Sequence, residues 1–289
     1  MHTPVLLNEA IEVLAPKAGE FFIDGTIDGG GHALAVLEKI LPTGKLLGVD
    51  WDKELIEKAK KKFPKENTVL VNDNFKNLPL ILKEKKLPLA DGLFLDLGFS
   101  SWHLEKSGRG FSFNAVAGEE PLLMTYSLSQ KSVCQWLKEL SVKELAEVIK
   151  NFSQERYSER IAQAIKENLP QTTDELVQII KAAVPKNYEH GRINPATRTF
   201  LALRIFANQE LKNLQIFLSE LKEIIKSGGR VAIVTFNSLE DRLVKNFFRQ
   251  MVQKKEGNLL TKKFIKPTPA EIKINPRSRS AKLRALQIL

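Results

Sequence analysis

The sequence predicts an α/β protein whose doubly wound sheet is interrupted by a run of helices. Three observations lead to this prediction. Strand-like and helix-like segments alternate through the first hundred residues, a glycine-rich loop follows the first strand-like segment, and the alternation stops after residue 101 and resumes near residue 229. Alternating strands and helices are typical of a parallel sheet with helices on both faces. The interruption indicates an inserted domain.

Four strand-like segments are expected before the interruption, at residues 21–27, 45–51, 68–72 and 91–97. The first contains the apolar run FFI and leads into the loop DGTIDGGGH, after which residues 33–40 are expected to form a helix. This order is the beginning of a βαβ unit. The three glycines at positions 29–31 let the backbone approach a ligand because they carry no Cβ.

The interrupting segment is expected to be helical. Residues 102–118 are rich in glycine and serine without periodicity, and residues 122–193 have the spacing of several amphipathic helices. We therefore expect an inserted all-helical domain over residues 106–193. The sheet domain is then made by residues 1–105 and 194–289.

The second part of the sheet domain begins with a helix signal. Asn194 suits an N-cap and Pro195 suits the first helical position, so a long helix is expected over residues 196–226. A strand, a helix and a last strand then complete the sheet, at residues 229–236, 239–253 and 284–288.

Composition limits the class of protein. The 289 residues, of which 43% are hydrophobic, are enough for one large or two smaller cores. No apolar run approaches the roughly 20 residues that span a bilayer, and the N-terminus lacks the order of a signal peptide, so a cytoplasmic protein is expected. The single cysteine, Cys134, excludes a disulfide framework and a cysteine cluster for zinc; it is expected in the core, and no metal site is predicted.

The charge favours a polyanionic partner. The net charge is +10, from 44 basic against 34 acidic residues. Residues 262–289 carry eight basic residues and one acid, Glu271, so this basic segment is the expected phosphate contact. The alternative is a solvated surface in a lysine-rich chain.

The glycine-rich loop and the next strand predict an adenosine cofactor. Asp50 ends the second strand, about 20 residues after the loop, where a carboxylate can accept hydrogen bonds from a ribose diol. The loop matches neither phosphate-binding glycine pattern, and Asp24 and Asp28 would face a phosphate with negative charge. Acidic side chains suit the ammonium of S-adenosylmethionine better, which disfavours a nicotinamide oxidoreductase. A glycine-rich turn without any cofactor is the remaining alternative.

Two further residues are placed near this loop by the strand pattern. Asp96 ends the fourth strand and is expected to face the Asp24 loop, where it can hold an ammonium group or receive a substrate amine. A structural role as the cap of the next turn is the alternative. Phe75 follows the third strand and can pack on an adenine ring, although a single aromatic residue is more often ordinary core.

The chain resembles the MraW/RsmH family of S-adenosylmethionine-dependent methyltransferases, which methylate the exocyclic N4 of a cytidine in small-subunit (16S) ribosomal RNA. The matching blocks are HTPVLLNEA at His2, DGTIDGGGH at Asp24, GVDWD at Gly48, DLGFSSWHL at Asp96, RGFSF at Arg109, NPATRTFLALRI at Asn194, TFNSLEDR at Thr235 and NPRSRSAKLR at Asn275. The resemblance implies a class I methyltransferase domain, Rossmann-like, with an inserted helical domain for substrate recognition.

The resemblance also implies site residues and partners. The implied cofactor contacts are Gly30, Gly31, His32, Asp50, Phe75, Asp96 and His103. Asp96 is in addition the candidate catalytic residue, since an acceptor for the amine hydrogens could localise the lone pair of N4 and take the proton. Small-subunit ribosomal RNA or a ribosomal particle is the expected partner, with no membrane and no DNA, and the oligomeric state stays open.

Five positions depart from the family pattern. Asp28 replaces a usual glycine and His103 a usual glutamine, while Leu123, Thr125 and Asn237 replace aspartate, arginine and histidine. These departures keep a second hypothesis open, namely an RNA-binding ribosome-assembly factor that kept the fold and lost efficient chemistry. The retained cofactor block favours the enzyme.

Two other reactions at a nucleobase are disfavoured. A C5-cytosine methyltransferase needs a nucleophilic cysteine near the cofactor, and Cys134 lies in the inserted helices. A zinc deaminase needs H-x-E with P-C-x-x-C, which the chain lacks.

Overall fold

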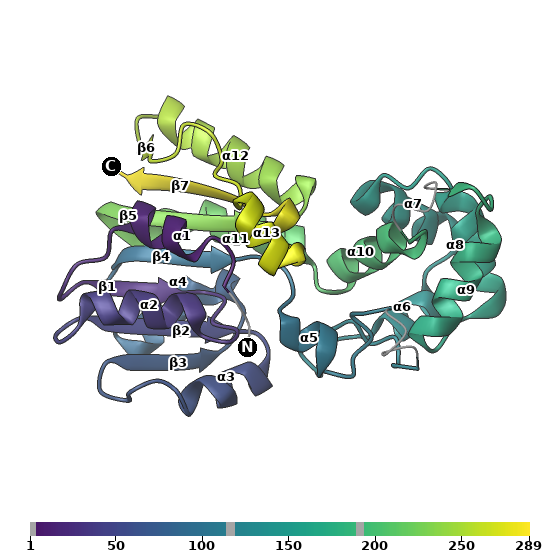
Figure 1. Ribbon diagram of the computed structural model, residues 1–289, viewed down its shortest axis with the longest axis horizontal. Coiled ribbons are helices and arrows are strands. Elements are labelled where there is room, and N and C mark those ends of the chain that lie inside the picture. The colour runs from purple at the N-terminus through teal and green to yellow at the C-terminus, as the bar shows by residue number, and fades with distance from the viewer. Residues whose placement is uncertain (1–3, 114–118, 189–193) are drawn as a thin grey trace. The chain divides into compact units, whose positions relative to one another are not determined.

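The computed structural model describes residues 4–113, 119–188 and 194–289 (Figure 1). The chain forms two compact units. The sheet unit comprises Met1–Gly98 and Leu211–Leu289, and the helical unit comprises Phe99–Glu210. Among the described residues no helix is long and apolar enough to cross a membrane.

The sheet unit is built on seven strands in the order β3-β2-β1-β4-β5-β7-β6. The strands are β1 (Phe21–Asp24), β2 (Lys45–Asp50), β3 (Thr68–Asn72), β4 (Ala90–Asp96), β5 (Ile225–Thr235), β6 (Gly257–Leu259) and β7 (Lys282–Ile288). The neighbours from β3 to β5 pair in parallel, whereas β7 runs antiparallel to β5 and β6. The chain direction across the sheet reverses between β1 and β4, which is the switch point of a doubly wound fold. The predicted Rossmann-like sheet is therefore confirmed.

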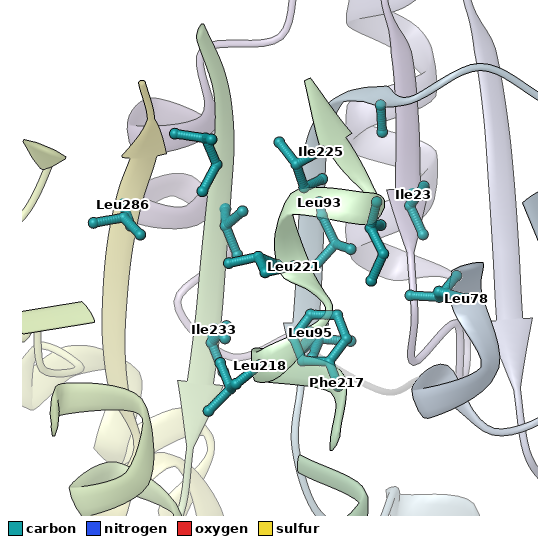
Figure 2. Close-up of a cluster of buried hydrophobic side chains, with 14 of the residues drawn as sticks. Ile23, Leu78, Leu93, Leu95, Phe217, Leu218, Leu221, Ile225, Ile233 and Leu286 are labelled. Carbon is teal, nitrogen blue, oxygen red and sulfur yellow. The ribbon is translucent and has the colours of Figure 1, made fainter. Parts of the chain in front are cut away.

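Helices cover both faces of this sheet, because successive residues of a strand point to opposite sides. One face is covered by α1 (Leu7–Leu14), α2 (Gly31–Ile40) and α3 (Lys53–Lys60), and the other by α4 (Leu78–Lys85), α11 (Glu210–Ser219) and α12 (Ser238–Gln253). In β1, Phe22 packs with the first set of helices and Ile23 with the second. Figure 2 shows the second face, where Phe217 and Leu218 of α11 lie against β4 and β5.

Short elements complete the sheet unit. They are the 3-10 turns η1 (Phe75–Asn77), η3 (Leu221–Glu223) and η4 (Pro276–Ser280) and the helix α13 (Pro269–Ile274). The edge strand β6 was not expected from the sequence, because three residues are too few to show a pattern.

The helical unit contains α5 (Ser101–Glu105), α6 (Val133–Glu139), α7 (Val142–Ser153), α8 (Ser158–Asn168), α9 (Thr173–Ala183) and α10 (Ala196–Ala207). Capping boxes begin α6, α7 and α9, at Ser132, Ser141 and Thr172. Cys134 packs at the margin of the helical core and is only partly buried. The described residues of this unit include no strand longer than the isolated bridge between Pro121 and Thr172.

The helical unit is longer than the insertion expected over residues 106–193, of which residues 114–118 and 189–193 lie outside the described part. At its end, α10 buries Phe200 and Leu203 in the core formed by the other helices. At its beginning, the α5 residue His103 contacts the rings of Phe111 and Tyr126. Packing of these two flanking helices places both within the unit.

The long helix expected over residues 196–226 is wrong. Asn194 lies just before α10, and its Oδ1 accepts from the Ala196 N–H at 3.0 Å, but the N-cap position is Pro195 and α10 ends at Ala207. The buried Asn208 amide donates to the Met124 carbonyl at 2.7 Å, and Gln209 takes a positive φ of 50°. The break depends on a partner 84 residues away, which helical periodicity does not reveal.

Candidate active site

Three aspartates, of which Asp24 is buried and Asp50 and Asp96 are partly buried, occupy the carboxyl ends of neighbouring strands. Asp24 ends β1, Asp50 ends β2 and Asp96 ends β4. Asp24 lies in register with Gly48 of β2 and Phe94 of β4, so each of the other two aspartates is two residues further along its strand. The three carboxyl groups therefore lie at one edge of the sheet, on both sides of the switch point, where ligands bind in open α/β sheets.

The loop after β1 is tied to the neighbouring strand β4. The Asp24 carboxylate accepts from the Thr26 N–H at 3.0 Å, and the Thr26 hydroxyl oxygen accepts from the Asp96 N–H at 2.7 Å. The expectation that Asp96 faces the Asp24 loop is confirmed. Because Asp24 turns the chain at this point, β1 is shorter than the strand expected over residues 21–27.

Asp50 joins the loop to the end of β2. One of its carboxylate oxygens accepts from the Asp28 N–H at 3.0 Å and the other from the Asp52 N–H at 2.8 Å. Each oxygen keeps a further lone pair, so the carboxylate can still accept hydrogen bonds from a ribose diol. Asp28 has a φ of 40°, the left-handed backbone that its place in the glycine pattern predicts, and its contact with Asp50 comes from the backbone.

Packing within the protein requires glycine at positions 30 and 31, in addition to the space that a ligand would need there. Gly30 has a φ of 82°, and a Cβ there would lie 2.7 Å from the ring of Phe63. A Cβ on Gly31 would lie 2.2 Å from the Cγ of Pro4. The loop therefore fits closely between the chain after α3 and the N-terminal segment.

His32 serves the same packing. Its Nε2 lies 3.0 Å from the Val5 carbonyl oxygen, and its ring centroid lies 4.2 Å from that of Phe94. The side chain is buried. These contacts hold the N-terminal segment against the loop, while a contact of His32 with the cofactor stays a prediction.

Burial and the repulsion of nearby charges raise the pKa of all three carboxyl groups, so that they stay protonated to a higher pH than exposed aspartates do. Burial raises the pKa of Asp24 to about 7 and that of Asp50 to about 8, and the charge of Asp28 adds to both. For Asp96, burial raises the pKa well above its usual value, and the charges of Asp28, Asp24 and Glu240 raise it further. Carboxylates gathered in this way favour a cationic ligand, because its charge relieves their repulsion.

Three buried polar atoms at this edge have no hydrogen-bond partner within the described part of the chain. They are Oδ1 of Asp96 at the end of β4, Nδ2 of Asn74 just after β3 and Nδ2 of Asn237 just after β5. Buried polar groups are normally paired, so orphaned ones indicate a ligand. An acceptor among carboxylates and two amide donors fit S-adenosylmethionine, which brings an ammonium, a carboxylate and an adenine.

Sequence reasoning missed Asn74, although it lies in the VNDNF segment that supplied Phe75. Asn74 caps η1 through its Oδ1, which accepts from the Lys76 N–H at 3.0 Å, and this leaves the amide nitrogen free for a ligand. Phe75 is half-buried and packs edge-on against Phe217, with ring centroids 5.6 Å apart. Its ring is thus positioned by the core beneath it.

Two departures from the family pattern, Asn237 and His103, cap helices. Asn237 begins α12, and its Oδ1 accepts from the Leu239 and Glu240 N–H groups at 3.0 Å each. Asparagine is among the best N-cap residues, which accounts for its presence there. In the helical unit, Nδ1 of His103 lies 3.1 Å from the N–H and the hydroxyl of Ser100 and completes a capping box for α5.

The two remaining departures lie between α5 and α6. Thr125 is buried, and its carbonyl and that of Tyr126 accept from the Arg109 guanidinium. The Leu123 carbonyl accepts from the Val133 N–H. Both positions contribute main-chain contacts, so the structure gives no reason for their particular side chains.

The sequence model of the MraW methylase family matches residues 1–289. The chain belongs to this family. The predicted fold class and the predicted cofactor, S-adenosylmethionine, are confirmed with it.

Curated relatives match over nearly their whole length. The ribosomal RNA small subunit methyltransferase H of Syntrophotalea carbinolica is 40% identical over 310 residues, which cover 100% of this chain and 98% of the relative. Its namesake in Fervidobacterium nodosum is 41% identical over 291 residues, or 98% of this chain and 96% of the relative.

Two solved structures are also similar at low identity. One is a putative rRNA methylase from Clostridium thermocellum, with 12% identity, a TM-score of 0.49 and 100% of both chains covered. The other is a putative methyltransferase from Streptococcus mutans in complex with SAH, with 11% identity, a TM-score of 0.45 and the same coverage.

Proposed function

We propose that this methyltransferase transfers a methyl group to the exocyclic N4 of a cytidine in small-subunit ribosomal RNA. The relatives at about 40% identity are named for small-subunit ribosomal RNA. The observation that carries the proposal is the buried Oδ1 of Asp96, which has no hydrogen-bond partner among the described residues and lies at the sheet edge shared by the three aspartates. An oxygen in this position can accept a hydrogen bond from the amine of a cytosine.

The reaction needs alignment more than it needs reactive side chains. Bound S-adenosylmethionine supplies an electrophilic methyl group on a sulfonium. In-line placement of the acceptor nitrogen accounts for most of the acceleration. Asp50 would hold the ribose hydroxyls, the ring of Phe75 would pack beside the adenine, and the backbone of Gly30 and Gly31 with His32 would border the methionine end.

Asp96 would act on the acceptor nitrogen. The lone pair of cytosine N4 is delocalised into the ring, and a carboxylate that accepts one amine hydrogen localises it. Methylation of N4 would leave a surplus proton on the nitrogen, because the electron pair of the broken bond between methyl carbon and sulfur would stay on the sulfur. The surplus proton on nitrogen passes to the Asp96 carboxylate, whose raised pKa suits a proton acceptor.

The substrate strand would be held outside the sheet edge. A base within RNA structure has to be splayed out before it can enter such a pocket. We assign substrate recognition to the helical unit, including the segment 106–193, and phosphate contacts to the basic segment 262–289. A role of His103 in cofactor binding stays a prediction. Either ribosomal RNA or a ribosomal particle fits this role, and the cytoplasm is the expected location.

The test is nucleoside mass spectrometry of ribosomal RNA from a deletion strain. An N4-methylcytidine species is expected to disappear, to return with the native gene and to stay absent with Asp96→Asn, which keeps the shape of the side chain but cannot take the proton. Retention of the nucleoside in the deletion strain would contradict the substrate assignment.

Binding measurements separate the enzyme from the assembly factor. Isothermal titration with S-adenosylmethionine is expected to show binding by the purified protein. If RNA binding were intact while no cofactor bound, the RNA-binding assembly factor would replace the enzyme as the proposed function.

A further inference from the structure

One aromatic ring has three cations around it, close to the sheet edge at which Asp24, Asp50 and Asp96 lie. The ring of Phe264 has Nζ of Lys266 at 5.3 Å, Nζ of Lys282 at 5.1 Å and the guanidinium carbon of Arg284 at 5.3 Å from its centroid. Cations are attracted to aromatic faces, so the ring holds side chains together that would otherwise repel one another. We name these four residues the Phe264 cluster.

The strand register places the Phe264 cluster beside the aspartates. Lys282 begins β7 and pairs with Thr235, the last residue of β5, while Asp96 of β4 pairs with Val234. The beginning of β7 therefore lies two strands away from the end of β4, at the sheet edge where the three aspartates lie. With neighbouring strands about 4.8 Å apart, the backbones at Asp96 and Lys282 are on the order of 10 Å apart.

Two of the cations are fixed in place by an acid on α12. The Asp241 carboxylate accepts from Lys282 at 3.1 Å and from Arg284 at 2.7 Å. Burial opposes ionisation of Asp241, but the hydrogen bonds from Arg284 and Lys282 outweigh it and lower the pKa of the carboxyl. With one acid against three cations, the Phe264 cluster keeps a net positive charge. Because Asp241 already holds the side chains of Lys282 and Arg284, they lose less conformational entropy when a ligand binds.

The neighbouring segment extends the positive surface. Lys262, Lys263, Lys273, Arg277 and Arg279 are all exposed. The only acid in this segment, Glu271, accepts from the Leu6 N–H at 2.9 Å and so serves the fold. Ile274, on α13 among these cations, is 76% exposed, which suits contact with the apolar face of a base or sugar.

We propose that the Phe264 cluster binds a backbone phosphate of the RNA strand next to the nucleotide whose base enters the active site. The inference rests on the proposed function, because it takes RNA as the substrate. Its support is the anchored, uncompensated positive charge at the same sheet edge as Asp96, with the backbones at Asp96 and Lys282 on the order of 10 Å apart. Phosphate is the group that such a cluster recognises.

Charge-removing variants test the proposal in the full-length protein. Lys266→Gln and Lys282→Gln each remove one cation from the cluster. Lys226→Gln is the matched control, because Lys226 lies at the opposite end of β5 and, like Lys282, is paired with an aspartate, Asp91. Fluorescence anisotropy with a labelled single-stranded oligoribonucleotide gives the binding constant as a function of salt concentration.

Each cluster variant is expected to reduce the slope of log K against log salt by about 0.7, the value for one phosphate contact on a single strand. Lys226→Gln is expected to keep the native slope. Titration with S-adenosylhomocysteine checks that all variants retain a native cofactor site. If the slopes of Lys266→Gln and Lys282→Gln equal that of Lys226→Gln, the proposal is overturned.

A substitution of the ring separates its role from that of the charges. Phe264→Leu keeps the three cations but removes the aromatic face that gathers them, so affinity should fall roughly two- to fivefold with the salt slope unchanged. An unchanged affinity would contradict the role of the ring. Native protein that binds RNA with its full slope but forms no N4-methylcytidine would overturn the proposed function and leave the phosphate site standing.

Discussion

We expect S-adenosylmethionine to release protons when it binds, because the aspartates at the sheet edge have raised pKa values. Substitution of Asp28 tests this expectation. Its charge raises the pKa of Asp24, Asp50 and Asp96. Asp28→Asn removes this charge with little change of shape. Asparagine also tolerates the φ of 40° at this position, and the backbone N–H that donates to Asp50 remains.

The magnitude follows from the two pKa values. With values of about 7 and about 8, roughly half of the Asp24 groups and roughly nine-tenths of the Asp50 groups are protonated at pH 7 before binding. If a bound cation ionises both, about 1.4 protons leave, and affinity rises roughly 25-fold per pH unit near pH 7. Asp28→Asn lowers the pKa of these carboxyls, so fewer protons leave and the pH dependence moves to lower pH.

Isothermal titration in two buffers of different ionisation enthalpy counts the protons between pH 6 and pH 8. S-adenosylhomocysteine is the matched ligand, because it lacks the sulfonium charge and should release fewer protons than S-adenosylmethionine. The reasoning is refuted if affinity is independent of pH over this range, or if native protein and Asp28→Asn release the same number of protons.

The same carboxyls should make the ligand-free protein less stable at higher pH. A carboxyl whose pKa is raised on folding contributes stability that is complete below its unfolded value of 3.8 and is lost as pH rises through the folded value, about 7 for Asp24 and about 8 for Asp50. Asp28→Asn should therefore gain stability over native protein at pH 8 and show little difference at pH 4. Urea denaturation at both pH values measures this, and an equal difference at both would contradict it.

Three further substitutions test the packing around the site by chemical denaturation. Gly30→Ala should cost well over 1 kcal/mol, because strain at a φ of 82° is joined by the clash of the new Cβ with an aromatic ring. Glu271→Ala should cost about 1–3 kcal/mol, because it leaves the buried Leu6 N–H without its acceptor. Asn237→Ala should cost about 1 kcal/mol through loss of the N-cap of α12.

Each of these substitutions has a matched control. Gly228→Ala has the same φ of 82° with nothing within 4 Å of the added Cβ, so equal losses at the two glycines would show that the clash plays no part. Glu271→Gln keeps an acceptor oxygen and should recover most of the stability. Asn237→Ser keeps a capping oxygen, and a loss as large as that of alanine would exclude the cap as the cause.

Most strands of the sheet unit could be predicted from local sequence patterns. β3 was placed at its observed bounds, and β2 and β4 within one residue, because apolar runs between loops mark buried strands. Asp50 and Asp96 could be located because each directly ends such a strand. The break at Asn208 was missed, since a helical pattern continues through it and the partner of its side chain is Met124.

The candidate site divides in the same way. The sequence by itself located the glycine-rich loop and the strand-terminal aspartates, because these are contiguous motifs. Only the tertiary structure decided what these residues contact. The His32 ring contacts Val5, one Asp96 oxygen has no partner within the described ranges of the chain, and the Phe264 ring gathers cations from β7. Burial, hydrogen-bond satisfaction and the convergence of charges depend on segments far apart in the chain, so they exist only once the sheet has brought those segments to one edge.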